Sequence, residues 1–324
     1  MERRRALKLL GGGLTAIASG KAVDNVLLGY GAVVGTNLHE QDVGAFVTEA
    51  LLDGIRTTDL GRNQLQLWDD VLRVTHDGEP RTTRRYTELS PEEARALDER
   101  YGLDGLVADA RPTLQALHAG EYEVVPASYG PFFERVRRAD PAPASVELLR
   151  SDERTDPATV RAFAGADPTD PEAVVEGLVA GFREHTSYDV PRYTAGSVQH
   201  NVIFGAVDVK QHLEDDVDFD SLLENENTGM FCNEFADRAV EALHAAPARD
   251  QSAPVFVGRV RDVRHRHVYT AIASIVREDG DLVVPVTFVD YTHSTLYDDF
   301  HVRGLLGAGL DAYNTRHRMT GLWW

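Results

Sequence analysis

Two runs of strand-forming residues lie on either side of Asp279-Gly280 in the last part of the chain. The run from Val263 to Val276 alternates as a half-buried strand does, and the run from Leu282 to Asp290 is rich in Val, Thr and Phe. Asp-Gly between two such runs is the strongest short-range signal for a β-hairpin with a two-residue loop. The sequence therefore predicts an antiparallel hairpin whose register pairs Tyr269 with Asp290.

The predicted register also places His267 opposite Thr292 and close to Asp290. Because side chains alternate with a period of two, His267 and Asp290 lie on one face as diagonal neighbours, about 7 Å apart at the backbone. A carboxylate on one imidazole nitrogen fixes the tautomer and stabilises the imidazolium, as a catalytic base requires. His265 shares this face but lies one step further from Asp290, so we expect His267 to be the base unless a bulge shifts the register.

Cys232 is the only cysteine, and the sequence predicts that it lies in the first turn of a helix. Loop and cap types occupy residues 227–229, and good helix formers with an apolar stripe follow from Met230. There the free backbone N–H groups and the helix dipole favour a thiolate, and the N–H of Cys232 is a candidate oxyanion donor. The alternative is a buried structural cysteine, which has no need of this position.

The order Cys232, His267, Asp290, on a helix start followed by two strands, resembles the transglutaminase-like superfamily. Tyr269 stands where tryptophan is common in that family, and Tyr291 stands where proline often follows the aspartate. The resemblance implies an α+β fold with a papain-like core, in which the cysteine helix packs on an antiparallel sheet, and it implies that the three residues form a catalytic triad. The matching segments are residues 229–232, 254–258, 267–269 and 289–292, together with an upstream helix that ends near residues 182–189.

This resemblance implies acyl transfer through a Cys232 thioester. We expect hydrolysis of an amide or peptide bond in a protein or peptide substrate, because water is always present whereas an amine acceptor needs a dedicated site. Two alternatives stay open: an amine-accepting crosslinking enzyme, and a catalytically inactive binding or assembly module. Gln199 and Asn201 are the candidates for a second oxyanion donor.

Residues 1–40 have the layout of an export signal. Arg3-Arg4 precedes Leu7-Lys8 and an uncharged run from Leu9 to Gly20, which is similar to a twin-arginine signal and is shorter than the roughly 20 residues that span a bilayer. A second apolar stretch follows from Val26 to Leu38. The alternative prediction is therefore a retained anchor that associates with the membrane surface. The other alternative is a basic helix that packs on the body of a cytoplasmic protein.

The net charge of −19 argues against nucleic acid and anionic lipid as general partners, since an acidic surface repels phosphates, and leaves membrane association through the N-terminus open. Lysine occurs only at Lys8, Lys21 and Lys210, and the basic residues are otherwise arginine. This composition indicates either adaptation to high salt, as in a halophilic prokaryote, or a GC-rich genome. The oligomeric state cannot be read from it.

The rest of the chain divides into a mixed α/β region of unknown role, residues 41–150, and the transglutaminase-like domain, residues 151–324. Helices are predicted over residues 42–55, from Ser90-Pro91 and over residues 172–185, and a single strand is predicted over residues 65–75. A closing helix is predicted over residues 304–313, and Trp323 and Trp324 are expected to dock on the body.

No cofactor or metal is expected. A glycine pattern at Gly29, Gly31 and Gly35 has the wrong spacing for a dinucleotide loop. One cysteine cannot form a Cys-based zinc cage or an intramolecular disulfide. The spacing of His200, Asp208 and His212 matches no known ligand set.

Overall fold

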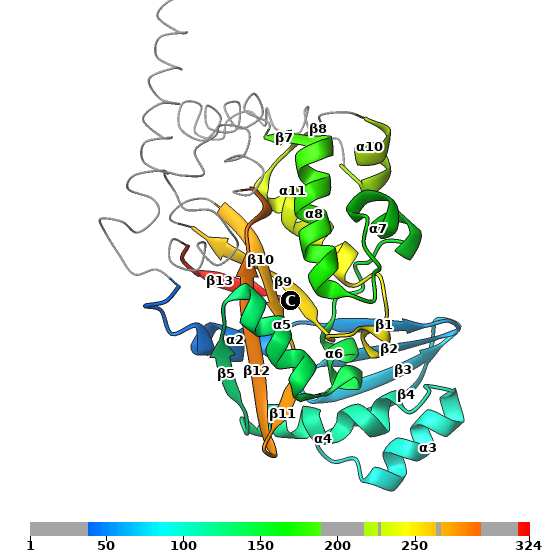
Figure 1. The fold of residues 1–324 in the computed structure, drawn as a ribbon. Helices are drawn as coiled ribbons and strands as arrows, with labels where there is room; N and C mark the ends of the chain where they lie inside the picture. Colours follow the sequence, from blue (N-terminus) through cyan, green and yellow to red (C-terminus); the bar gives the residue numbers. More distant parts are fainter. Residues whose placement is uncertain (1–37, 189–216, 226–227, 264–266, 293–316) are drawn as a thin grey trace, which may run out of the picture.

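A computed structural model describes residues 38–188, 217–225, 228–263, 267–292 and 317–324 of the chain. Over these residues the protein is a mixed α+β structure with a largely antiparallel sheet and helices packed on it (Figure 1). The predicted fold class, α+β, is confirmed at this level. The export signal or anchor is predicted within residues 1–40, and residues 1–37 lie outside the described residues. None of the described helices is long and apolar enough to cross a membrane.

Seven of the described strands form the main sheet, in the order β13-β9-β10-β12-β11-β6, with β5 paired to the other edge of β12. Only the β5–β12 pair is parallel. The strands are β5 (Glu123–Pro126), β6 (Asp140–Pro141), β9 (Phe256–Asp262), β10 (His267–Ala273), β11 (Val276–Glu278), β12 (Asp281–Val289) and β13 (Gly321–Trp323).

The central hairpin has the register that Asp279-Gly280 predicts. Asp279 and Gly280 both have positive φ, 52° and 99°, as the two loop residues of a tight hairpin require. Val276 pairs with Val283 and Thr270 pairs with Val289, which continues the same register along the strands. The hairpin prediction is therefore confirmed, and no bulge separates the loop from the end that carries His267 and Asp290.

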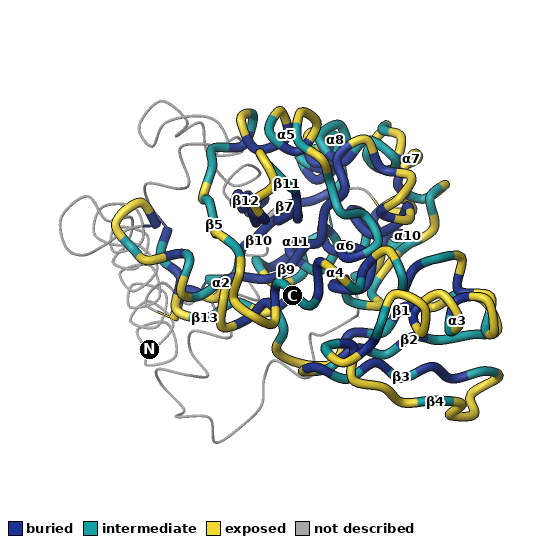
Figure 2. Tube along the Cα trace, turned by 90° about the horizontal axis from the view of Figure 1, so that it is seen from below, coloured by how far each residue is buried: buried dark blue, intermediate teal, exposed yellow. Residues whose placement is uncertain are grey.

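The central strands β10 and β12 are buried on both faces of the main sheet, so they are apolar almost throughout. Along β12, Leu282, Val284, Val286 and Phe288 belong to one hydrophobic cluster, and Val283 and Val289 belong to the other. Figure 2 shows α5 (Tyr129–Arg138), α7 (Pro157–Ala164) and α8 (Pro171–His185) on one side of these strands and α2 (Val43–Leu51) on the other.

The helices predicted at the start, near Ser90 and before residue 185 are all present. The first is α2, with Val43, Val47, Ala50 and Leu51 buried. The second is α3 (Pro91–Tyr101), where Ser90 and Glu93 cap each other's backbone N–H groups. The third is α8, which buries Val174, Val175, Leu178 and Phe182.

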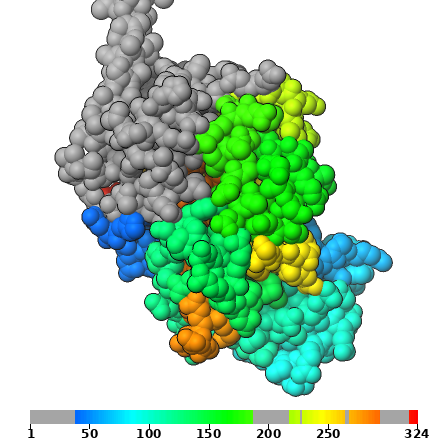
Figure 3. All heavy atoms as spheres, viewed as in Figure 1, coloured from blue at the N-terminus to red at the C-terminus, as the bar shows by residue number. Residues whose placement is uncertain are grey.

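The prediction of one strand over residues 65–75 is wrong. Two strands, β2 (Asn63–Trp68) and β3 (Val71–His76), pair with each other, and Asp69 between them has a φ of 51°. An aspartate tolerates this left-handed conformation, so a tight turn forms without glycine. With β1 (Arg56–Leu60) and β4 (Glu79–Arg85) they form a four-stranded sheet, which together with α3 projects from the body in blue and cyan (Figure 3).

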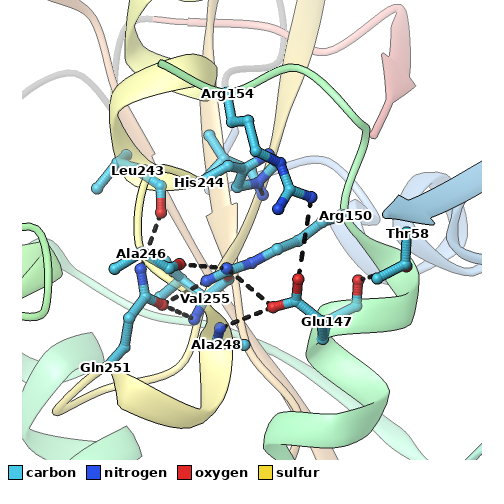
Figure 4. A network of polar contacts seen from close by, with 11 residues as sticks. Thr58, Glu147, Arg150, Arg154, Leu243, His244, Ala246, Ala248, Gln251 and Val255 are labelled. Carbon is cyan, nitrogen blue, oxygen red and sulfur yellow. Dashed lines mark hydrogen bonds and ion pairs between the residues drawn. The ribbon is translucent and has the colours of Figure 1, made fainter. Parts of the chain in front are cut away.

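Arg150 anchors the residues that follow α6 (Pro143–Leu149) to the start of β9 (Figure 4). Its Nε atom donates to the carbonyl of Val255 at 2.8 Å, and Nη1 donates to the carbonyl of Ala246 at 2.7 Å and to Glu147 at 3.2 Å. Burial lowers the pKa of Arg150 to about 10, against the attraction of Glu147, so the guanidinium stays charged at neutral pH. This cluster of polar contacts joins residues from both sides of position 150, where the sequence predicts a domain boundary.

The end of the chain packs against Gly258 of β9. A Cβ atom at Gly258 would lie 2.4 Å from the carbonyl oxygen of Trp323 and 2.7 Å from the ring of Trp324, so only glycine fits. Trp324 is buried against Phe256, with ring centroids 4.7 Å apart, whereas Trp323 is 41% exposed. Docking is therefore confirmed for both residues, because Trp323 pairs with Arg259 of β9, whereas packing in the core is confirmed for Trp324 and wrong for Trp323.

The cysteine helix, α11 (Cys232–Leu243), packs on β9, β10 and α8. The short strands β7 (Thr186–Tyr188) and β8 (Thr228–Met230) pair in parallel, so the end of α8 runs beside the segment that leads to Cys232. The other elements are α4 (Leu106–Ala119), α10 (Phe219–Glu224) and the 3-10 turn η3 (Ala248–Asp250).

Candidate active site

Cys232 is the first residue of α11, as predicted. Phe231 before it is extended, with φ −107° and ψ 166°, and its backbone N–H donates to the carboxylate of Glu234 at 2.6 Å. The cysteine side chain is partly exposed rather than enclosed in the core. It therefore sits at the positive end of a helix dipole, where a thiolate is stabilised and a reagent can approach.

His267 and Asp290 are in direct contact. His267 is the first residue of β10, Asp290 follows the last residue of β12, and the imidazole Nε2 lies 2.6 Å from Oδ2 of Asp290. The His267 side chain is 14% exposed and that of Asp290 is 1% exposed. The predicted diagonal pairing thus gives a hydrogen bond that is shielded from water.

His267 also interacts with Cys232. Burial by itself lowers the pKa of His267, but the charge of Asp290, the hydrogen bond to Asp290 and the hydrogen bond and charge of Cys232 outweigh it, so the pKa of His267 lies well above its usual value. Since Nε2 is bonded to Asp290, Nδ1 is the nitrogen left for the thiol. The three predicted residues are brought together in the order that a relay of thiol, imidazole and carboxylate needs.

A second imidazole, His317, was missed by the sequence reasoning. Its Nε2 atom lies 2.7 Å from Oδ2 of Asp290, the same oxygen that His267 contacts, and its side chain is 1% exposed. No motif in Arg316-His317-Arg318 points to this role. Only the pairing of β13 with β9, which comes after His317 in the chain, carries this residue to the end of the hairpin.

His267, Asp290 and His317 are the one group of described residues with the composition of a metal site, with their ligand atoms within 4.8 Å of one another. Ligands held about 2.0–2.1 Å from a tetrahedral zinc lie about 3.3 Å apart. The two N to O distances here are 2.6 and 2.7 Å, which are hydrogen-bond distances. The arrangement therefore fits two imidazole donors on one carboxylate better than a metal centre.

Other residues and segments that the sequence singles out lie outside the described residues. They are the alternative base His265, the oxyanion candidates Gln199 and Asn201, the predicted closing helix over residues 304–313, and two patterns whose spacing fits no known site, namely Gly29, Gly31 and Gly35 and the set His200, Asp208 and His212.

No protein-family model, curated protein or solved structure matches this chain.

Proposed function

We propose that this protein is a transglutaminase-like cysteine acyl-transfer enzyme that hydrolyses an amide or peptide bond through a Cys232 thioester. One observation carries the proposal: the thiol of Cys232, at the start of α11, interacts with His267, and His267 is hydrogen-bonded to the buried carboxylate of Asp290. Cys232 lies at a helix N-terminus, His267 is partly buried and Asp290 is almost fully buried. These are the environments that a nucleophile, a base and an orienting carboxylate need.

The raised pKa of His267 favours an imidazolium beside a thiolate in the resting enzyme. The thiolate of Cys232 attacks the amide carbonyl carbon, a C–S bond forms, and the carbonyl electron pair moves to oxygen. The C–N bond then breaks, and His267 gives its proton to the departing amine. Water attacks the thioester, His267 accepts a proton from it, and the acid and the Cys232 thiolate are released.

The tetrahedral intermediate needs donors for its oxyanion. The backbone N–H of Cys232 is suited to this, because first-turn N–H groups have no partner within the helix and point out of its N-terminus. A papain-like core is also part of the proposal, and the packing of α11 on β9 and β10 supports it. Export of the protein stays a prediction from its first forty residues.

Alkylation of the single cysteine tests the proposal directly. Iodoacetamide in limiting amount is added to the folded protein at pH 7 in high salt, and mass spectrometry measures the rate at Cys232. We expect a rate above that of the same thiol in urea-unfolded protein. A thiol that reacts no faster when folded would contradict an activated nucleophile.

Substrate profiling separates the remaining alternatives. Wild type and Cys232→Ala are incubated with a peptide library, with and without a fluorescent primary amine. Cysteine-dependent cleavage supports a hydrolase, and incorporation of the amine in preference to cleavage supports a crosslinking enzyme. An inactive binding or assembly module predicts identical results for the two proteins.

A further inference from the structure

We propose that His317 is a positioning residue of this site, which holds the Asp290 carboxylate in the orientation that His267 requires. The inference rests on the proposed function and adds to it a fourth residue. It is carried by one oxygen atom, Oδ2 of Asp290, which lies 2.6 Å from Nε2 of His267 and 2.7 Å from Nε2 of His317.

The shared oxygen determines which imidazole nitrogens carry hydrogen. A carboxylate can only accept, so each Nε2 that bonds to it must donate. This leaves Nδ1 of His267 for the thiol and makes His317 a second donor to the same carboxylate. Asp290 is 1% exposed, so water contributes little to its solvation and the two imidazoles replace it.

The backbone of His317 and Met319 is hydrogen-bonded to Leu38 and Gln41. Its carbonyl accepts from the N–H of Leu38 at 2.7 Å. Two residues further on, Met319 N–H donates to Oε1 of Gln41 at 2.7 Å and its carbonyl accepts from Nε2 of Gln41 at 2.9 Å. The amide of Gln41 therefore bonds the backbone of Met319 as a neighbouring strand would. Residues near position 40 thus help to fix the position of His317, far along the chain.

Titratable groups of the sheet also lie next to His317 and Arg318. The hydroxyl of Tyr269 donates to the carbonyl of Arg318 at 2.8 Å, and its ring packs edge-on against the His317 ring, with centroids 4.8 Å apart. The carboxylate of Asp262, 1% exposed, accepts from the N–H of Arg318 at 3.2 Å. Burial, with the charges of Asp262 and Asp290, raises the pKa of Tyr269, so its hydroxyl keeps the proton that it donates.

These contacts give the imidazole of His317 little freedom to turn away from Asp290. The donor from His317, whose backbone is fixed, adds a restriction on the rotation of the Asp290 carboxylate about its last torsion. A rotated Asp290 would no longer orient His267 toward the thiol. His317 thus acts through Asp290 and has no need to touch the substrate.

The test compares His317→Leu with His317→Gln. Leucine removes the donor, and the glutamine amide nitrogen can occupy the place of Nε2 and restore it. The rate of iodoacetamide alkylation of Cys232 is measured from pH 5 to pH 9, beside thermal unfolding. We expect the pH profile of alkylation of His317→Leu to move about one unit to higher pH, which makes the reaction about tenfold slower on the acid side of both profiles, and we expect His317→Gln to recover most of the rate.

A double-substitution cycle with Asp290→Asn distinguishes positioning from a general loss of packing. If His317 acts through Asp290, His317→Leu changes the alkylation rate of wild type but leaves that of Asp290→Asn unaltered. Additive effects, or a pH profile of His317→Leu identical to that of wild type, would overturn the inference. A wild-type thiol that is not activated would contradict the proposed function. An activated wild-type thiol that His317→Leu leaves unchanged would contradict the role of His317 alone, so the two results are distinguishable.

Elemental analysis provides a further check on the metal alternative. One equivalent of zinc retained through purification, with alkylation that changes when EDTA is added, would overturn the hydrogen-bonded arrangement in favour of a metal centre at His267, Asp290 and His317. Protein free of zinc, with alkylation unaffected by EDTA, supports the positioning role.

Discussion

The imidazole Nε2 of His267 lies 2.6 Å from Oδ2 of Asp290, although 23 positions separate the two residues in the chain. A two-residue hairpin loop brings them together, because it sets which residues of β10 and β12 face each other. The proposed catalytic base is therefore oriented by the pairing of two strands, at the end where Asp290 follows β12, which suits a group that must keep its geometry through a reaction.

Asp290→Asn should lower the pKa of His267. The carboxylate provides both charge attraction and a hydrogen bond, and burial, which lowers the pKa of this imidazole, stays in place. We expect the histidine titration followed by NMR to move to lower pH and amide hydrolysis to fall by about 10²–10⁴-fold, the usual contribution of general acid–base catalysis. An unchanged titration would show that the contact has no electrostatic effect.

The same contact should make stability depend on pH. The pKa of His267 is raised in the folded protein above the ordinary 6.5, so its contribution to stability is complete below pH 6.5 and is lost as pH rises through the folded value. Urea unfolding of wild type and Asp290→Asn should therefore give free energies that differ most at pH 6 and converge toward alkaline pH. A difference that grows with pH would contradict this sign.

Replacing Arg150 by methionine should destabilise the protein by about 3–5 kcal/mol, the range for removal of one partner of a buried ion pair. The substitution leaves the carboxylate of Glu147, 9% exposed, without its buried cation, and removes the donors to the carbonyls of Ala246 and Val255. Urea denaturation measures the loss.

Arg154→Met is the matched control for Arg150. Its guanidinium lies 3.9 Å from Glu147 and its side chain is 33% exposed, so we expect at most about 1 kcal/mol. Equal losses for the two substitutions would show that burial of the guanidinium is not what matters.

Gly258→Ala should displace the end of the chain from the sheet. The new Cβ would overlap backbone and ring atoms of Trp323 and Trp324, and overpacking of this kind costs about 1–3 kcal/mol. Because β13 holds the segment that carries His317, we also expect slower alkylation of Cys232. Gly321→Ala, whose Cβ would meet only a side-chain atom of Arg261 at 4.0 Å, should leave the unfolding free energy and the alkylation rate nearly unchanged.

Local patterns were sufficient for the elements that carry the proposed nucleophile and base. The Asp279-Gly280 turn predicted the register correctly, because a loop of two residues leaves a single way to pair the strands. The start of α11 at Cys232 followed from the change from loop residues to helix formers. The turn at Asp69 was missed, because an aspartate with positive φ gives no signal as clear as glycine.

The sequence alone determined the hairpin register and the position of Cys232 at a helix start, since each depends on residues that are close together in the chain. The α+β class followed from the resemblance that these segments carry. Tertiary structure alone decided that His317 shares a carboxylate oxygen with His267, that the amide of Gln41 bonds the backbone of Met319, and that Arg150 is buried. The first two contacts join residues that are 27 and 278 positions apart. Such pairings arise when strands and helices pack together, and no local pattern of residue types encodes them.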